Sequence, residues 1–459
     1  MNSRLKFHRL QEQLQRGAID RRTFMVRAFA LGVSGSAVMA SLSRFGLAAA
    51  QDGTPAAAGA ASIGNPAIEH LTTTDKGVIR LYSSWPLTGA YEQIGGDAVQ
   101  AIQLALEDFG SAAGGFALEY EALDDGIAAN NGGWDAGAES ANANQVISDA
   151  DAMVYMATYN SGAAKISIPI MNEAGMAMIS YANTYPGLTK AVEGATEEGE
   201  PDTYYPSGQR NYMRTVPADD IQGVAGANWA YESKGVRKAY VLDDQSLYGH
   251  GVAQVFNNAF AALGGEILGA EGYDPKAPDY QALMTKIADM GPDIVYVGAT
   301  VDNNAPKVAL DMRSLMPIDQ VLFMGPDGLI NQAFIDGAGD AVNGSFITFA
   351  GFPPNALEGA GADYATRMTE ILGHSPDSYA TYAYECTAVV IQAIDQVQEK
   401  DRGAILEAML ATSDFASLLG GTWSFTETGD TDAITMAVNV IEPNDEGVLD
   451  FAFLEAIGV

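Results

Sequence analysis

From Gly77 onward, the chain alternates between two patterns of apolar residues. Short apolar runs such as VIRLYSSW (78–85) and AMVYMAT (152–158) have the composition of buried strands, and stretches such as DAVQAIQLALEDF (97–109) have the three-to-four-residue apolar spacing of a helix. Strands and helices that alternate in this way predict a parallel sheet with helices on both faces.

The alternation runs through two successive series. In the first series the predicted strands cover 78–85, 116–125, 152–158 and 176–182, and the predicted helices cover 97–109, 134–148 and 162–174. In the second series the strands cover 238–244, 266–273, 293–299 and 321–325, and the helices cover 219–233, 250–263, 279–290 and 304–314. A strand at 344–352, helices near 359–372, 377–399 and 402–412, and an antiparallel tail follow.

Two such series predict an α/β fold with two doubly wound parallel-sheet lobes, joined by a hinge, and a ligand cleft between them. We expect the first lobe to contain 77–216 and about 352–420, and the second lobe to contain 217–351 and about 421–459. The polar, turn-rich stretch at 186–212 predicts a surface insertion in the first lobe.

The N-terminus has the features of an export signal. The sequence DRRTF (20–24) resembles the twin-arginine export motif, and the 15-residue run AFALGVSGSAVMASL that follows is too short and too weakly apolar to span a bilayer comfortably. Small residues before and at Ala50 offer a cleavage site. We therefore expect a twin-arginine signal peptide at 1–50, a flexible leader at 51–76, and a protein exported to the periplasm or extracytoplasmic space. An ordinary amphipathic helix is the alternative for the N-terminus.

Composition narrows the classes of function. A formal net charge of −34 disfavours binding to nucleic acid or to an anionic membrane, because both need clustered Lys and Arg. Cys386 is the only cysteine, so an intrachain disulfide and a cysteine-based metal site are excluded. The four histidines lie far apart in the sequence and no cofactor motif is present, so we expect no metal and no cofactor.

Polar residues follow the predicted strands at their carboxyl ends, where open parallel sheets bind ligands. In the first series, Ser161 follows one strand, and Ala182 and Thr184 lie at the end of the next. A serine at a helix start caps the helix, and the neighbouring N–H groups attract an anion. These three residues form a candidate site for a carboxylate, although a plain helix cap at Ser161 and a plain loop hydroxyl at Thr184 fit the spacing equally well.

Different types of side chain follow the strands of the second series: two hydroxyl-bearing residues and a carboxylate. Tyr248 comes after the first strand, Thr300 after the third, and Asp327 after the fourth, in the sequence FMGPDG. A carboxylate here can meet an ammonium through a charge-assisted hydrogen bond, and the ring of Tyr248 can pack against a ligand. Taken alone, Asp327 is more typical of a Pro-Asp-Gly turn, and Tyr248 is more typical of a packing residue.

At these positions the chain resembles the leucine/isoleucine/valine-binding proteins, which are type I periplasmic binding proteins that serve ABC importers. The resemblance covers about 77–459, and its markers in chain order are PLTGAYEQIGGDAVQAIQLALED, the Ser161 turn, ISYANT, RTVPADDIQG, DDQSLYGHGVA, FMGPDG and YATYAYECTAVV. It implies the type I periplasmic binding protein fold, in which two lobes close over a small ligand.

The resemblance also implies roles for individual residues. Ser161, Ala182 and Thr184 match the positions that hold the amino-acid head group in that family. Asp327 falls where the family often has an acidic residue for the ammonium, and Tyr248 matches an aromatic residue that covers the ligand after closure.

The side-chain pocket departs from the family pattern. Ile94 and Thr300 stand where some amino-acid binders have an aromatic residue, and Tyr379 is a candidate for one wall. We interpret the chain as an exported, monomeric substrate-binding protein that captures a branched-chain or related small amino acid and delivers it to the permease of an ABC importer. A binder of amides, urea or aromatic acids and a ligand-sensing subunit are the alternatives. An enzyme on this fold has little support, because no nucleophile elbow, dinucleotide fingerprint, phosphate loop or H-E-x-x-H motif is present.

Overall fold

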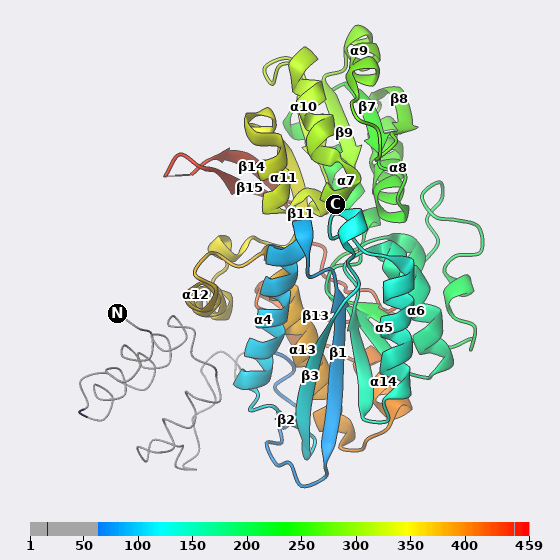
Figure 1. Cartoon of the computed structure of the whole chain (residues 1–459), viewed down its shortest axis with the longest axis vertical. Coiled ribbons are helices and arrows are strands. Elements are labelled where there is room, and N and C mark those ends of the chain that lie inside the picture. Colours follow the sequence, from blue (N-terminus) through cyan, green and yellow to red (C-terminus); the bar gives the residue numbers. More distant parts are fainter. Residues whose placement is uncertain (1–15, 17–62, 445, 459) are drawn as a thin grey trace. The chain divides into compact units, whose positions relative to one another are not determined.

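The computed structural model describes Arg16, residues 63–444 and residues 446–458 (Figure 1). The chain divides into two units, Met1–Ala57 and Ala58–Val459, and all the described helices and strands belong to the second unit. The predicted twin-arginine motif, the cleavage site and most of the leader lie outside the described residues. In the part of the chain that is described, no helix is both long enough and apolar enough to cross a membrane.

The first lobe is built on a six-stranded sheet. Its strands, in spatial order, are β2 (Ala112–Ala113), β3 (Phe116–Asp124), β1 (Val78–Trp85), β4 (Ala152–Ala157), β5 (Ala177–Ser180) and β6 (Tyr212–Arg214). All neighbours are parallel except β2 and β3. Every residue of β4 is buried, as a parallel strand covered on both faces requires.

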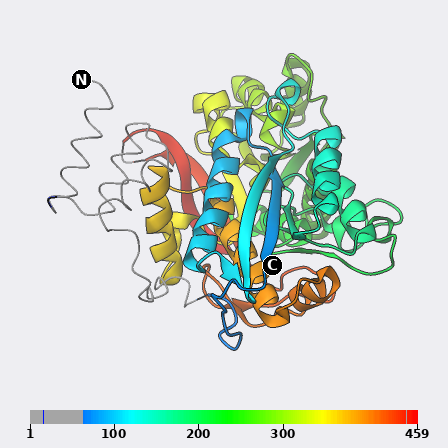
Figure 2. The ribbon, with the colours of Figure 1, turned by 60° about the horizontal axis from the view of Figure 1, so that its bottom comes forward.

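Helices from two distant parts of the sequence cover this sheet. They are α4 (Glu92–Asp108), α5 (Ala136–Ser148), α6 (Ser161–Glu173), α13 (Ser378–Val397) and α14 (Arg402–Leu410). The late helix α13 packs along the early helix α4, and α14 packs on β4 and β5. Figure 2 shows the orange helix α13 beside the blue helix α4. The helix α12 (Ala360–Leu372) also packs against α4.

The second lobe is built on a seven-stranded sheet. Its strands, in spatial order, are β15 (Leu449–Ile457), β14 (Met436–Pro443), β11 (Phe346–Ala350), β10 (Leu322–Gly325), β9 (Ile294–Gly298), β7 (Lys238–Asp243) and β8 (Glu266–Gly272). The strands from β11 to β8 are parallel, and β14 and β15 add an antiparallel hairpin. Its helices are α7 (Asp219–Asn228), α8 (Leu247–Ala262), α9 (Gln281–Met290), α10 (Ala305–Leu315) and α11 (Gln332–Ala338). A small pair, β12 (Phe415–Ala416) and β13 (Thr422–Trp423), precedes the final crossing.

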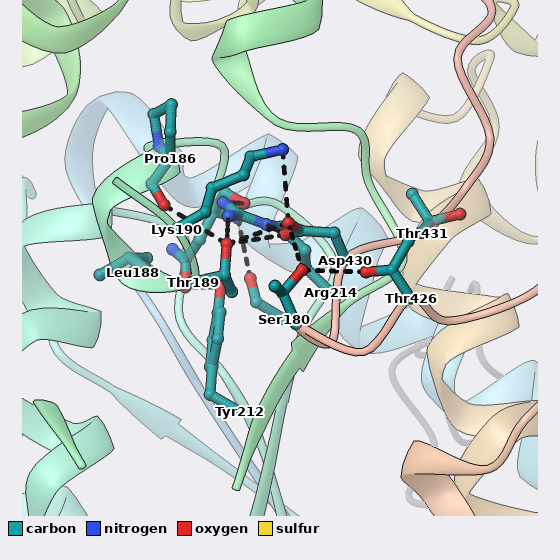
Figure 3. Close-up of polar contacts among 12 residues, drawn as sticks. Ser180, Pro186, Leu188, Thr189, Lys190, Tyr212, Arg214, Thr426, Asp430 and Thr431 are labelled. Atoms are coloured by element: carbon teal, nitrogen blue, oxygen red, sulfur yellow. Dashed lines mark hydrogen bonds and ion pairs between the residues drawn. The ribbon is translucent and has the colours of Figure 1, made fainter. Parts of the chain in front are cut away.

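The chain passes between the two sheets three times, after β6, after β11 and after β13. The first and third passages are joined by Arg214, which is completely buried (Figure 3). Its Nε donates to Asp430 Oδ1 at 2.7 Å, and its other nitrogens donate to the carbonyl oxygens of Asn183 and Tyr185 and to the hydroxyl of Thr189. All of the guanidinium nitrogens are therefore satisfied inside the protein.

Asp430 is the counter-charge of this buried arginine. It also accepts from the hydroxyls of Thr189 and Thr428, and Lys190 Nζ lies 3.4 Å from it. Burial acts to raise the pKa of Asp430, but the charges of Arg214 and Lys190 and the hydrogen bonds prevail and lower it to about 2. The carboxylate is thus ionised and firmly held where two crossings meet.

The predicted surface insertion at 186–212 is packed more tightly than expected. Leu188 and Tyr204 are buried, and the hydroxyls of Tyr185 and Tyr204 both donate to the carboxylate of Glu200. The segment also borders the second lobe, because a methyl group placed on Gly194 would lie 3.0 Å from Asn258 Nδ2 on α8. A methyl group placed on Gly251 of α8 would lie 2.6 Å from the ring of Tyr185, which directly precedes the segment. Polar composition concealed this packing, since tyrosine hydroxyls and Glu200 satisfy one another in the interior.

Candidate functional site

A small cavity lies between the lobes at the carboxyl ends of the strands. Its lining comes from both lobes and consists of Tyr159, Asn160, Ser161, Ala182, Thr184, Tyr248, Thr300, Gly328 and Tyr379. Every lining residue other than Gly328 has a buried side chain. The two lobes are therefore closed over the cavity in this structure.

The first lobe contributes the start of α6 and the loop after β5. Ser161 is the first residue of α6, whereas Asn160 occupies the cap position, so Ser161 is not the helix cap that its position allowed. Its hydroxyl instead accepts the N–H of Tyr185 at 3.3 Å. Because the first N–H groups of a helix have no partner within the helix, this wall favours an anion.

The loop after β5 is shaped by Ser180. Its hydroxyl oxygen accepts the N–H groups of Ala182 at 3.0 Å and Asn183 at 2.8 Å, which fixes the backbone that leads to Thr184. The carbonyl oxygen of Thr184 accepts the N–H of Asp219 at 2.8 Å, so the start of α7 is tied to the same loop. The first-lobe wall is thus held by its own hydrogen bonds.

The second lobe contributes Asp327, which is 1% exposed and begins a short 3-10 turn. Its carboxylate accepts the hydroxyl of Tyr248 at 2.6 Å and the hydroxyl of Tyr379 at 2.7 Å. Burial raises the pKa of Asp327, and these two hydroxyls oppose the rise. Tyr379 belongs to α13 of the first lobe, so Asp327 links the lobes directly behind the cavity.

Gly328 allows this arrangement. A methyl group at this position would lie 2.6 Å from the ring of Tyr248 and 2.8 Å from the carbonyl oxygen of Ala299. The N–H of Gly328 donates to the hydroxyl oxygen of Tyr248 at 2.8 Å, and that hydroxyl in turn donates to Asp327. The Pro-Asp-Gly turn therefore serves to bring a carboxylate, a glycine backbone and a tyrosine together.

Further contacts between the lobes surround the cavity. The hydroxyl of Tyr91 donates to Asp302, and Asn331 Nδ2 donates to the carbonyl oxygen of Ala90 at 3.0 Å. Thr300 is fixed from within the second lobe, because its N–H donates to Asp244 Oδ2 at 3.0 Å. The bonds from Tyr91 to Asp302 and from Asn331 to Ala90 form only when the lobes are together.

Aromatic rings form much of the remaining wall. The ring of Tyr159 lies 5.4 Å from that of Tyr379 and 4.8 Å from that of Trp85, and Trp85 stacks on Tyr181 with a centroid distance of 4.4 Å. Rings at these distances pack favourably and rigidly. The cavity therefore combines a polar end with a stiff aromatic wall.

Several buried polar atoms around the cavity lack hydrogen bonds within the described part of the chain. They are the hydroxyl of Tyr159, Oδ1 of Asn160 and both carboxylate oxygens of Asp219. Buried polar groups are nearly always paired, so atoms without a partner beside a cavity are typical of a site that binds a polar ligand.

The structure brings six of the predicted residues together in the cavity lining: Ser161, Ala182, Thr184, Tyr248, Thr300 and Tyr379. Asp327 adjoins the lining through its bonds to two of them. Ile94 is not brought to the cavity, because it lies on the core-facing side of α4. Its expected contact with a ligand is therefore not supported.

Sequence reasoning missed Tyr159, Asn160, Gly328 and Asp219. Tyr159 and Asn160 directly precede Ser161 in the strand-end sequence, and that adjacency was the available signal. Asp219 stands in the first turn of α7, where an acidic residue is usually explained by the helix dipole alone.

Comparisons with known proteins bear on the family. The chain matches the family model "Periplasmic binding protein" over residues 79–447. The Leu/Ile/Val-binding protein homolog 1 of Brucella suis biovar 1 is 28% identical over 247 residues, which are 53% of this chain and 63% of that relative, so less than two thirds of the relative's length is matched.

Two solved structures have a similar fold. The leucine binding protein LivK from Thermotoga maritima MSB8 has a TM-score of 0.71 at 22% identity, covering 83% of this chain and 99% of that one. An ABC transporter solute binding protein from R. palustris, in complex with benzoate, has a TM-score of 0.67 at 19% identity, covering 83% and 98%. These likenesses confirm the predicted two-lobed α/β fold. Together with the match of the family model over most of the sequence, they lead to one conclusion: the chain belongs to the periplasmic binding protein family.

Proposed function

We propose that the chain is the solute-binding protein of an ABC importer and that its ligand is a small amino acid, branched-chain or related. The observation that carries the choice of ligand is the buried carboxylate of Asp327 opposite the start of α6. A carboxylate group of the ligand would lie at the N–H groups of Ser161 and the Thr184 loop, and an ammonium would lie toward Asp327. An α-amino acid has both groups at a fixed short separation.

Ligand capture would couple to movement of the lobes. The ligand enters an open cleft, contacts both walls and stabilises the closed form by its greater affinity for it. Tyr248 from one lobe and Tyr379 from the other meet at Asp327, so closure completes the polar end of the site. The closed form would then dock on the permease, and no bond in the ligand is made or broken.

Aromatic acids are the second candidate class, because the R. palustris relative holds benzoate and the walls here include Tyr159, Tyr248 and Tyr379. Benzoate has no ammonium to offset the buried charge of Asp327, so this class fits the polar end less well. Urea and short amides would offer N–H donors to Asp327 without a full charge. A sensing subunit would use the same site and differ only in its partner.

Catalysis has no comparable support. His250 lies on the first turn of α8 with 55% of its side chain exposed and pairs with Asp243, and it does not line the cavity. Within the described residues, no group of three or more His, Cys, Asp and Glu is arranged to hold a metal ion.

Calorimetry of the purified protein tests the proposal. The panel would contain leucine, isoleucine, valine, alanine and threonine, with urea, acetamide and benzoate as the competing classes. We expect one-to-one binding of at least one aliphatic amino acid and no binding of benzoate. Binding of benzoate alone would show that the ligand is an aromatic acid, and binding of urea or acetamide alone would show that it is an amide.

A further inference from the structure

The described part of the predicted leader, residues 63–76, is bonded to the first lobe and forms an N-terminal strap on it. Near its start, Gly64 and Ala416 of β12 exchange two backbone hydrogen bonds, at 2.9 and 3.1 Å. At its end, Lys76 Nζ donates to the carbonyl oxygen of Gly114 at 2.8 Å. Both ends of the strap are therefore attached to parts of the lobe that lie far from it in the sequence.

His70 lies between these two ends, and both of its ring nitrogens meet acceptors. Nδ1 is 2.7 Å from Asp395 Oδ2 on α13, and Nε2 is 2.9 Å from the carbonyl oxygen of Phe109 at the end of α4. A neutral imidazole has only one N–H, and its other nitrogen is an acceptor. Both contacts are satisfied only when His70 is protonated at both nitrogens or shares a proton with Asp395.

Asp395 is arranged as an acceptor for this proton. Its side chain has no exposed surface, and its Oδ1 accepts the N–H groups of Leu71 at 3.1 Å and Gly114 at 2.7 Å. Loss of the proton between Nδ1 and Oδ2 would bring two lone pairs face to face and leave a buried carboxylate without its charged partner. In agreement, the hydrogen bond to Asp395 raises the pKa of His70 against the opposing effect of burial.

The other charged groups beside His70 do not take over the role of Asp395. Lys76, on the strap, directs its ammonium to two backbone carbonyl oxygens, and Asp108, on α4, is bound to an arginine of α12. Glu69, the preceding residue, is exposed to solvent. The charge that acts on the His70 ring is that of Asp395.

The strap joins the far ends of two helices whose near ends lie at the cavity. The helix α4 directly follows Tyr91, whose hydroxyl donates to the second lobe, and it ends beside Phe109. The helix α13 starts next to Tyr379, which also bonds to the second lobe, and it carries Asp395 near its end. The two helices pack along each other, and His70 connects them at the end away from the ligand.

We propose that the strap is a pH-dependent fastening of the first lobe, held in place by a proton between His70 and Asp395 and released when that proton is lost. The inference goes beyond ligand capture and does not depend on which ligand the cleft takes. The proton leaves to solvent, and the strap loses its charged contact with α13.

Hydrogen exchange of the purified protein from about pH 6 to about pH 9 tests the inference. The reporters are the amide N–H groups of Leu71 and Gly114, which both donate to Asp395, with exchange rates corrected for the intrinsic effect of pH. Because the pKa of His70 is raised in the folded state, the stabilisation is complete below about pH 6.5 and is lost as pH rises through the folded pKa. We expect protection to fall by up to about tenfold per pH unit across that window and to level off above it.

Two variants separate the proton from the rest of the strap. His70→Gln has no titrating group at this position, so its protection should be lower at pH 6 and independent of pH. His374→Gln, at a histidine whose side chain is 43% exposed, is the matched control and should keep the wild-type profile. Nitrogen-15 NMR of the histidine rings gives a direct readout, because the signals absent from His70→Gln should show a protonated Nδ1 and Nε2 at pH 6.

Two results would overturn the inference. Corrected protection in the wild type that does not change with pH would show that no proton fastens the strap. Absence of protection at Leu71 and Gly114 at every pH would show that the strap is not attached through Asp395. Ligand binding is not measured in these experiments, so neither result bears on the proposed function.

Discussion

Asp430 and Asp219 are both buried carboxylates near the crossing that follows β6, yet only Asp430 has a cation of its own. Asp430 lies against Arg214 and Lys190, and its pKa falls to about 2. The carboxylate oxygens of Asp219 have no hydrogen-bond partner among the described residues, and burial raises the pKa of Asp219 well above its usual value. A buried acid with a fixed cation joins parts of the fold in its charged form, whereas burial without a cation favours the protonated form.

The largest expected effect is the loss of stability when the buried ion pair between Arg214 and Asp430 is broken. Asp430→Asn should lower the free energy of unfolding by roughly 3 kcal/mol or more, because it leaves the guanidinium of Arg214 buried without its counter-charge. Urea unfolding followed by circular dichroism measures the change. Asp319→Asn, at an exposed position, is the matched control and should change stability by less than about 0.5 kcal/mol. Equal losses of stability in both variants would show that the carboxylate of Asp430 contributes no more to folding than an exposed one.

Glu139, a buried acid without a cation, should make the protein less stable as pH rises, whereas Asp430 should make it less stable as pH falls. Glu139 is buried, accepts the hydroxyls of Ser84 and Tyr155, and has a pKa of about 7 because burial raises it against those hydrogen bonds. A folded pKa above the unfolded value means that the folded state binds the proton more tightly, so this contribution to stability is present below about pH 4 and is lost as pH rises through about 7.

Comparison of the wild type with Glu139→Gln isolates that contribution. The wild type should lose up to about 3 kcal/mol relative to the variant between pH 4 and pH 8, as measured by urea unfolding at each pH. Asp430 should show the reverse, because its lowered pKa contributes stability that is present above about pH 4 and is lost as pH falls toward 2. If the difference in unfolding free energy between wild type and Glu139→Gln did not change with pH, the raised pKa of Glu139 would be contradicted.

Asp327→Asn should act on ligand binding more than on folding. Removing the carboxylate should weaken binding of an amino acid by more than about 2 kcal/mol, because the ammonium would be buried without a counter-charge. The unliganded protein should keep most of its stability, since the variant also removes an uncompensated buried charge. Calorimetry and thermal unfolding measure the two quantities, and Asp336→Asn on the exposed side of α11 is the control. Unchanged affinity would show that Asp327 is only a turn residue and does not contact the ligand.

The smallest expected effect concerns the contact between α8 and Tyr185, the residue that directly precedes the 186–212 segment. Gly251→Ala would press a methyl group against the ring of Tyr185 and should disfavour closure, weakening ligand binding by about 1 kcal/mol without unfolding the protein. Gly96→Ala on α4 is the matched control, because the space beside Gly96 is open and alanine is the better helix former. A similar affinity in both variants would show that this contact does not influence closure.

The order of helices and strands was largely predictable from sequence, because parallel strands buried on both faces give continuous apolar runs. The run at 78–85 coincides with β1, and the run at 152–158 differs from β4 by one residue. The short helix α11 was missed because two turns with Gly337 inside give little periodic signal. The helix α4 begins at Glu92, five residues before the predicted start, because Gly95 and Gly96 conceal its first turn.

The site was only partly predictable, for a different physical reason. Strand ends identify which residues face a cleft, and this rule together with the family resemblance located Ser161, Thr184 and Tyr248. Burial without a partner is a property of the whole tertiary structure, however, and no local pattern distinguishes Asp219 from Asp220 in the sequence ADDI. The assignment of ligand contacts remains a proposal, as do the residue limits of the lobes.

The ion pair between Arg214 and Asp430 joins positions 216 residues apart, and it has a consequence for how the chain reaches its native state. The first lobe starts at β1 but is completed only by α13, α14 and the passage that contains Asp430. A ribosome therefore releases nearly the whole chain before either lobe is able to form a complete core. Contacts this distant make loop closure costly and folding slow, so the two lobes should acquire structure together after synthesis rather than one after the other during it.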